Sequence, residues 1–330
     1  MSTRLQLKDY LEGFRKGDRT VLARAITLVE SQNPEHQKLA GELLRELLPK
    51  SGQAKRIGIS GTPGVGKSTF IEAFGKLLTS QDKIVAVLAV DPTSQVTGGS
   101  ILGDKTRMNE LAIDPLAFIR PSPSGETLGG VARRTRETIL LCEAFGFDYV
   151  LVETVGVGQS ETTVAQMVDI FVMLLQPGAG DDLQGIKRGI LEVVDLVVVT
   201  KDDGDQQKII QKAKHDYERA LQILRHDSRI PPVLSCSALT KSGLPEVQKT
   251  IDAFFQKQQT LIIEKRNRQG LDWMWQLIEE ALRASFEETM GQRSLEAAEQ
   301  LVLSQNATAP QVVTNLLSEY FKSLSVPKNS

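Results

Sequence analysis

Residues 56–70, RIGISGTPGVGKSTF, contain the residue types and spacing that most clearly predict chemistry. After an apolar run come a glycine, four residues, a second glycine, a lysine and a serine, which matches the phosphate-binding pattern G-x-x-x-x-G-K-[ST]. Glycines let successive backbone N–H groups turn toward an anion, and the helix that follows adds its positive end. The predicted nucleotide-binding residues of this loop are Gly61, Thr62, Pro63, Gly64, Val65, Gly66, Lys67, Ser68 and Thr69.

The residues at the end of this loop have distinct predicted roles. Lys67 is expected to reach the β- and γ-phosphate oxygens as a point charge, and the Ser68 hydroxyl to ligate Mg²⁺ between those phosphates. Thr69 is expected to assist at the α-phosphate. The loop therefore predicts a nucleoside triphosphate bound together with Mg²⁺.

An acidic residue closes a second apolar run, in the stretch VLVETVG at residues 150–156. Glu153 ends the run and Gly156 follows three residues later, which is the spacing of a switch that senses a γ-phosphate. We expect the Glu153 carboxylate to lie near Mg²⁺ and the Gly156 N–H to contact the γ-phosphate. A capped strand end is the structural alternative.

Two aspartates are further candidates for contact with the cation. Asp91 follows another apolar run, and Asp104 follows a glycine-rich stretch at residues 98–103. Mg²⁺ usually keeps several waters and takes one or two carboxylates, so either residue can be a direct or water-mediated ligand. The alternatives are that Asp91 caps a turn before Pro92 and that Asp104 is a helix N-cap.

The stretch Lys201-Asp202-Asp203 after DLVVVT addresses the identity of the base. In the guanine pattern Asn-Lys-x-Asp, the last carboxylate accepts from the guanine N1–H and 2-amino groups, and adenine offers neither donor. Asp203 therefore predicts guanine, because leaving this carboxylate unpaired against adenine is costly. Thr200 replaces the usual asparagine, which leaves the contact near guanine N7 open, although its hydroxyl can still tie the loop together. The loop Ser237-Ala238-Leu239 is expected to offer a backbone N–H to the guanine O6.

The elements needed to position these residues follow from hydrophobic periodicity. Residues 1–54 are helical in pattern, with breaks at Gly17-Asp18 and Asn33-Pro34, and residues 259–330 return to helical patterns, where dimerisation is expected. Residues 55–258 alternate short apolar runs with amphipathic segments, which predicts a P-loop NTPase domain with a largely parallel, doubly wound α/β sheet. The predicted strands are Arg56–Ser60, Ile84–Val90, Leu116–Arg120, Tyr149–Glu153, Ile170–Leu175, Leu196–Thr200 and Val233–Cys236.

Composition excludes several classes of protein. The formal net charge is −2, with 24% charged and 41% hydrophobic residues, which gives no basic excess for nucleic acid or a membrane surface. No apolar run is long enough to span a membrane. Cys142 and Cys236 lie in separate apolar segments and are expected to be core thiols. A cytoplasmic location is the expectation.

Five stretches together resemble the MeaB/ArgK/MMAA family of P-loop GTPases over nearly the whole chain: GTPGVGKSTF, AVDPTSQVTGGSILGDKTRMN, VETVGVGQSE, GAGDDLQGIKRG and VTKDDGD. The resemblance implies a homodimeric GTPase that binds GTP and GDP. It also implies a chaperone of an adenosylcobalamin-dependent acyl-CoA mutase, typically methylmalonyl-CoA mutase. By the same resemblance, Asp181, Gln184 and Lys187 lie in a third switch, where Lys187 would bring positive charge to the transition state.

Four other functions are alternatives to this one. A GTPase that delivers nickel or cobalt needs clustered soft or imidazole ligands, whereas His36, His215 and His226 do not cluster in the sequence with the two cysteines. A kinase linked to amino-acid transport is disfavoured, because the sequence contains no protein-kinase catalytic loop. A scaffold that does not hydrolyse GTP would retain Lys67, Ser68 and Glu153 for nucleotide binding alone. Thr62 stands where related two-lysine ATPases carry a second lysine, which disfavours that class.

Overall fold

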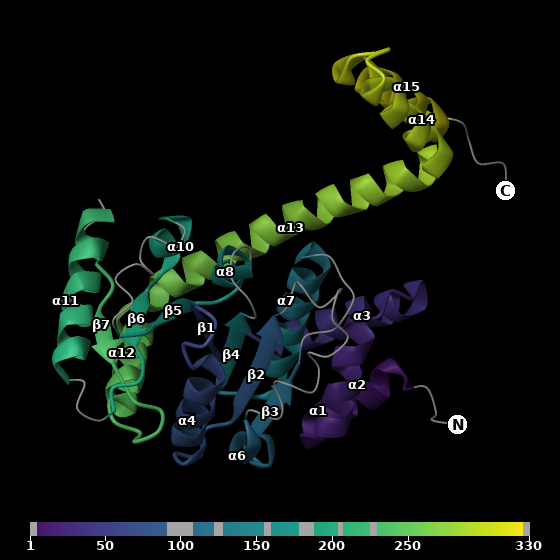
Figure 1. The fold of residues 1–330 in the computed structure, drawn as a ribbon. Coiled ribbons are helices and arrows are strands. Elements are labelled where there is room, and N and C mark those ends of the chain that lie inside the picture. Colours follow the sequence, from purple (N-terminus) through teal and green to yellow (C-terminus); the bar gives the residue numbers. More distant parts are fainter. Residues whose placement is uncertain are drawn as a thin grey trace. The chain divides into compact units, whose positions relative to one another are not determined.

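The computed structural model describes residues 5–90, 108–121, 128–154, 160–177, 188–203, 207–224 and 230–325. A seven-stranded, all-parallel sheet has the order β3-β2-β4-β1-β5-β6-β7 (Figure 1). This confirms the predicted doubly wound α/β class. The strands are β1 (Lys55–Gly61), β2 (Val85–Val90), β3 (Ala117–Arg120), β4 (Tyr149–Thr154), β5 (Ile170–Leu175), β6 (Leu196–Val199) and β7 (Val233–Ser235).

Both faces of the sheet are buried, and successive residues of a strand point to opposite faces. In β2, Val85 and Val87 belong to one hydrophobic cluster, and Ala86, Leu88 and Val90 to the other. Because the side chains on both faces are buried, each strand is a continuous apolar run in the sequence.

The covering helices separate into two layers. One layer includes α4 (Lys67–Thr79) and α12 (Leu244–Lys257), and the other includes α7 (Leu128–Phe145) and α11 (Gln207–Leu224). Short helices α6 (Asn109–Ala112), α8 (Ser160–Ala165) and α10 (Arg188–Val193) lie in the connections.

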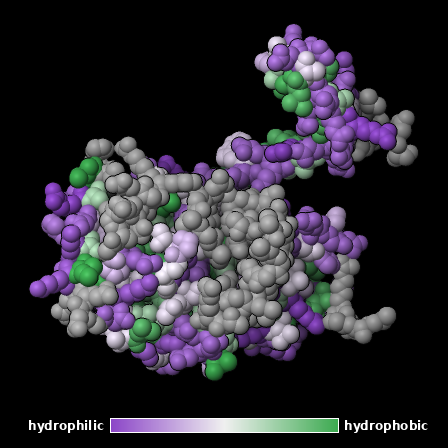
Figure 2. Space-filling view, viewed as in Figure 1, coloured by the Kyte–Doolittle hydropathy of each residue, from purple (hydrophilic) through white to green (hydrophobic). Residues whose placement is uncertain are grey.

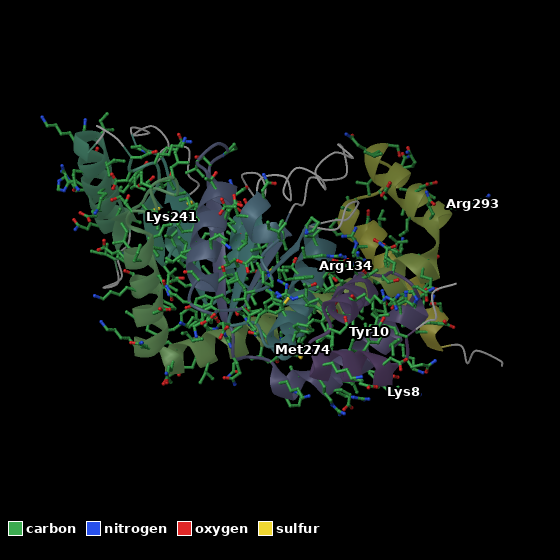
Figure 3. All side chains as sticks on the ribbon, turned by 90° about the horizontal axis from the view of Figure 1, so that it is seen from below. Lys8, Tyr10, Arg134, Lys241, Met274 and Arg293 are labelled. Carbon is green, nitrogen blue, oxygen red and sulfur yellow. The ribbon has the colours of Figure 1, made fainter. Side chains whose placement is uncertain are left out.

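The N-terminal helices extend the layer that contains α7. They are α1 (Leu7–Lys16), α2 (Arg19–Val29), α3 (Pro34–Leu47) and the 3₁₀ turn η1 (Leu48–Lys50). Their apolar side chains, Tyr10 (labelled in Figure 3) among them, join the same cluster as Cys142 and Phe147. The predicted helix starts are confirmed, because Asp18 accepts the N–H of Thr20 at 2.8 Å and Asn33 accepts that of Glu35 at 2.9 Å.

The amino edge of the sheet, where the strands begin, holds a buried network of charges. Arg266 bonds both carboxylate oxygens of Asp169 at 2.7 Å, and its other donors reach the carbonyls of Gly52 and Ala54. Arg56 forms two 2.7 Å bonds to Glu143. Burial alone would lower the pKa of Arg266, but Asp169 and then Glu143 raise it above its usual value.

Two compact units divide the chain, Met1–Arg266 and Asn267–Ser330. The second contains most of α13 (Gln259–Met290) together with α14 (Gln292–Leu303) and α15 (Ala309–Ser325). Green hydrophobic residues are visible on the surface of these terminal helices in Figure 2. The functional division of the chain at residues 54 and 258 stays a prediction.

Candidate nucleotide-binding site

The phosphate loop lies where β1 ends and α4 begins, as its sequence predicts. Gly61 is the last residue of β1, and a Cβ atom there would come within 2.5 Å of the Leu174 carbonyl oxygen on β5. Gly66 caps α4 with φ +97°, a conformation that side chains disfavour. Both glycines are therefore required by the backbone that turns toward the helix N-terminus.

Lys67 is the first residue of α4, and its side chain folds back over the loop. Its Nζ donates to the carbonyls of Gly61 at 2.7 Å and Thr62 at 3.4 Å. Burial lowers the pKa of Lys67, while the charges of Glu153 and Glu161 oppose that shift. The ammonium group is thus held in the loop by neutral acceptors, ready to exchange them for phosphate oxygens.

The two predicted cation ligands from this part of the chain come together. Ser68 Oγ donates to Glu153 Oε1 at 3.3 Å, and Glu153 is buried at the end of β4. The parallel register of β1 and β4, with Ile59 opposite Glu153, sets this approach. A hydroxyl and a carboxylate suit a hard cation such as Mg²⁺ that keeps several waters, so these residues fit the predicted ion.

A buried hydrogen bond braces the ends of the same two strands. Thr154 Oγ1 donates to Ser60 Oγ at 2.9 Å. Both side chains are almost fully buried. The bond joins the residue before the phosphate loop to the residue after Glu153.

The predicted base-recognition loop is tied directly to the phosphate loop. Thr200 Oγ1 lies 2.8 Å from the Val65 carbonyl and 3.2 Å from that of Leu175. Lys201, with φ +63°, donates through Nζ to the Gly64 carbonyl at 3.1 Å. The threonine hydroxyl therefore links the two loops, as the sequence suggested it could.

The companion loop after β7 is hydrogen-bonded to the base-recognition loop through Asp202. Asp202 N donates to the Cys236 carbonyl at 3.1 Å, which joins the two loops. Ser237 is fully buried, and its Oγ accepts the Thr240 N–H at 3.2 Å. Within the described residues, no hydrogen bond uses the N–H groups of Ala238 and Leu239, so both are available to a base oxygen.

Gln176, which the sequence did not single out, contacts the base-recognition loop. Its Oε1 accepts from Lys201 Nζ at 3.2 Å, and its carbonyl accepts from the Tyr217 hydroxyl of α11 at 3.2 Å. The available signal was its position directly after a buried strand, at the edge of a parallel sheet where ligands bind.

Several predicted site residues fall outside the described part of the chain: Asp91, Asp104, Gly156, Asp181, Gln184 and Lys187. Their roles stay predictions.

Among the described residues, no group of three His, Cys, Asp or Glu side chains could hold a metal ion. Cys142 and Cys236 are free and buried, as predicted, and burial raises the pKa of Cys236 to about 12.

The fold and the site define a P-loop GTPase, a class that comparison with known proteins supports. The chain belongs to the family described as methylmalonyl Co-A mutase-associated GTPase MeaB, which matches residues 22–291. The GTPase ArgK of Escherichia coli (strain K12) is 52% identical over 282 residues, covering 83% of this chain and 84% of that protein.

Two further relatives extend the similarity. A mouse (Mus musculus) protein named methylmalonic aciduria type A homolog, mitochondrial, is 47% identical over 328 residues, covering 94% of this chain and 78% of that protein. A crystal structure described as LAO/AO transport system kinase has a TM-score of 0.75 at 40% identity, covering 96% of this chain and 97% of that one. No helix in the described part of this chain is long and apolar enough to cross a membrane.

Proposed function

We propose that this GTPase depends on Mg²⁺ and serves as a chaperone of an adenosylcobalamin-dependent acyl-CoA mutase such as methylmalonyl-CoA mutase. Its nucleotide state gates loading of the cobalamin cofactor and protects the mutase. The observation that carries the proposal is the match of residues 22–291 to a family described by its association with that mutase.

In this proposal, each residue of the site has a separate role in GTP binding or hydrolysis. Lys67 exchanges its loop carbonyls for β- and γ-phosphate oxygens, and Asp203 accepts from the edge of the guanine. Ser68 and Glu153 would hold Mg²⁺, with Asp91 and Asp104 as further candidate ligands. The bound ion would neutralise charge that develops on the phosphates.

The isolated chain is proposed to hydrolyse GTP slowly and the mutase to raise the rate. Asp181, Gln184 and Lys187 form the proposed third switch, and a partner that brings Lys187 to the nucleotide would stabilise the transition state. An added cation of this kind can contribute roughly 10³–10⁵ in rate.

We further propose that the chain acts as a cytoplasmic homodimer through residues 259–330. Support comes from a stripe on α13 at helical spacing, Leu271, Met274, Trp275, Ile278 and Leu282, whose side chains are exposed in the monomer. Replacing Ile278 and Leu282 by Glu should convert a dimer to a monomer in sedimentation experiments. Monomeric wild-type chain at the same concentration would contradict the dimer.

The experiment that tests the central proposal measures GTP hydrolysis with and without a purified methylmalonyl-CoA mutase. We expect the mutase to raise the rate, and Lys187→Ala to retain GTP binding but to lose most of the stimulation. Lys212→Ala, at an exposed position of α11, is the matched control and should be stimulated like the wild type. Absence of stimulation in the wild type contradicts the mutase partnership, and equal stimulation of Lys187→Ala contradicts only the role of Lys187.

A further inference from the structure

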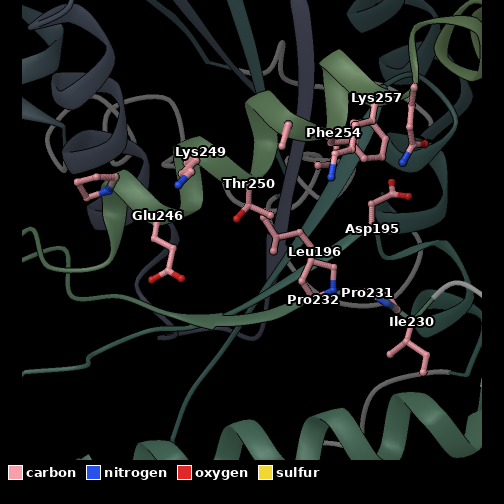
Figure 4. Close-up of a pocket in the computed structure, with 14 residues that line it drawn as sticks. Asp195, Leu196, Ile230, Pro231, Pro232, Glu246, Lys249, Thr250, Phe254 and Lys257 are labelled. Carbon is pink, nitrogen blue, oxygen red and sulfur yellow. The ribbon is translucent and has the colours of Figure 1, made fainter.

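A cavity of about 670 Å³ lies at the amino edge of the sheet, beside α12 (Figure 4). Ile170 and Leu196, the first residues of β5 and β6, line it, together with Pro231 and Pro232 just before β7. Because the strands are parallel, this edge is opposite the one that carries the phosphate and base loops. The volume is typical of small-molecule sites, which are about 300–1,000 Å³.

The lining of the cavity is largely apolar and includes one aromatic ring and proline rings. Leu196 and Ile170 are buried strand residues, and Phe254 of α12 lines the cavity with Pro231 and Pro232. Figure 4 shows Phe254, Leu196 and the two prolines around the same space. The faces of an aromatic ring and of proline rings favour a flat apolar ligand over a polar one.

Two lysines of α12 add positive charge to this lining. Lys249 and Lys257 are eight residues apart, which places them about 12 Å apart along one side of the helix. Both are exposed, and neither forms an ion pair within the part of the chain that the structure describes.

Among the described residues, neither acidic residue of the cavity forms an ion pair with these lysines. Asp195 accepts the Phe171 N–H at 2.9 Å and lies 3.7 Å from Lys265 Nζ. Glu246 lies in the first turn of α12, where the helix dipole stabilises a negative charge. Lys249 and Lys257 therefore remain available to an anionic group of a ligand.

We propose that this cavity is a second binding site, separate from the nucleotide site, for a small aromatic anion. The ring system packs against Phe254, Leu196 and the two prolines, and the acidic group lies at Lys249 or Lys257. The site depends neither on the third switch nor on a mutase, so its test is independent of the proposed function.

The test is a fluorescence titration of the full chain with 1-anilinonaphthalene-8-sulfonate, an apolar ring system that carries one sulfonate. Saturating GDP is present throughout, so that the nucleotide site is closed to the probe. Any binding to the terminal helices is common to all variants. We expect Ala253→Trp, which fills the cavity, to remove one class of probe sites. The double variant Lys249→Gln/Lys257→Gln should weaken that class about fivefold, by an amount that shrinks in high salt.

The controls separate loss of the site from loss of the fold. Lys208→Gln/Lys212→Gln removes two exposed lysines from α11 and should leave the titration unchanged. The lysine variants change only exposed positions, so they retain the fold even if Ala253→Trp does not. If the Lys249→Gln/Lys257→Gln curve coincides with that of the wild type, the proposal is wrong.

Discussion

The two edges of the sheet both hold buried charge, but that charge is satisfied in different ways. At the amino edge, Arg266 is enclosed by Asp169, Glu143 and two backbone carbonyls of the same chain. At the carboxyl edge, Lys67 donates to neutral carbonyls of its own loop, and burial lowers its pKa. In a charge network closed within the chain, removing one partner destabilises the fold, whereas a desolvated cation beside neutral acceptors can exchange them for an anionic ligand.

The largest expected effect on stability comes from breaking the closed network. Arg266→Met should lower the free energy of unfolding by about 3–5 kcal/mol, because Asp169 and Glu143 then remain buried without this cation. GTP hydrolysis per folded molecule should not change, since the nucleotide site lies at the other edge. Urea denaturation and a GTPase assay on the same samples measure both quantities.

Arg268→Met provides the control, because Arg268 is exposed two residues further along the same helix. It should unfold at the urea concentration of the wild type. If both variants lose the same small amount of stability, the amino edge is not a stabilising network.

Replacing the cation at the other edge by Met should instead lower activity and leave stability intact. Lys67→Met should lower kcat by roughly 10²–10³, the usual cost of one lost donor to transition-state charge. Its stability should be equal to or higher than that of the wild type. Single-turnover hydrolysis and urea denaturation of the same variant measure the two effects.

The pH dependence of stability follows from the direction of the Lys67 shift. The folded state lowers the pKa of Lys67 below its ordinary value of 10.5, so between the two values the unfolded chain binds more protons. Stability of the wild type relative to Lys67→Met should therefore rise as pH increases through that window. A difference that falls with pH would mean that the ammonium is stabilised rather than strained by burial.

Asp203 tests how the carboxyl edge selects its base. Asp203→Asn should lower the preference for GTP over xanthosine triphosphate by about 10–100-fold, because an amide pairs with the xanthine edge better than a carboxylate does. Nucleotide affinities measured by competition give this ratio. Asp202→Asn is the matched control, and an equal change in both variants would contradict the assignment to Asp203.

The sequence predicts the carboxyl edge better than the amino edge for a physical reason. Gly61 to Thr69 specify a local turn, and buried parallel strands carry Glu153 to the same edge as that turn. Gln176 was missed because no spacing marks it. The Arg266 network was missed because Asp169 lies 97 residues away in sequence, and only the packed tertiary structure brings the two together.

The smallest expected effect concerns the hydroxyl that joins the phosphate and base loops. Thr200→Val keeps the shape of the side chain but removes the hydrogen bonds to Val65 and Leu175, which should cost about 1 kcal/mol of stability. GTP affinity should fall severalfold, because the two loops are no longer held together before the nucleotide binds. Thr200→Ser retains the hydroxyl and should bind GTP like the wild type, whereas equally weak binding by both variants would show that the methyl group, not the bond, matters here.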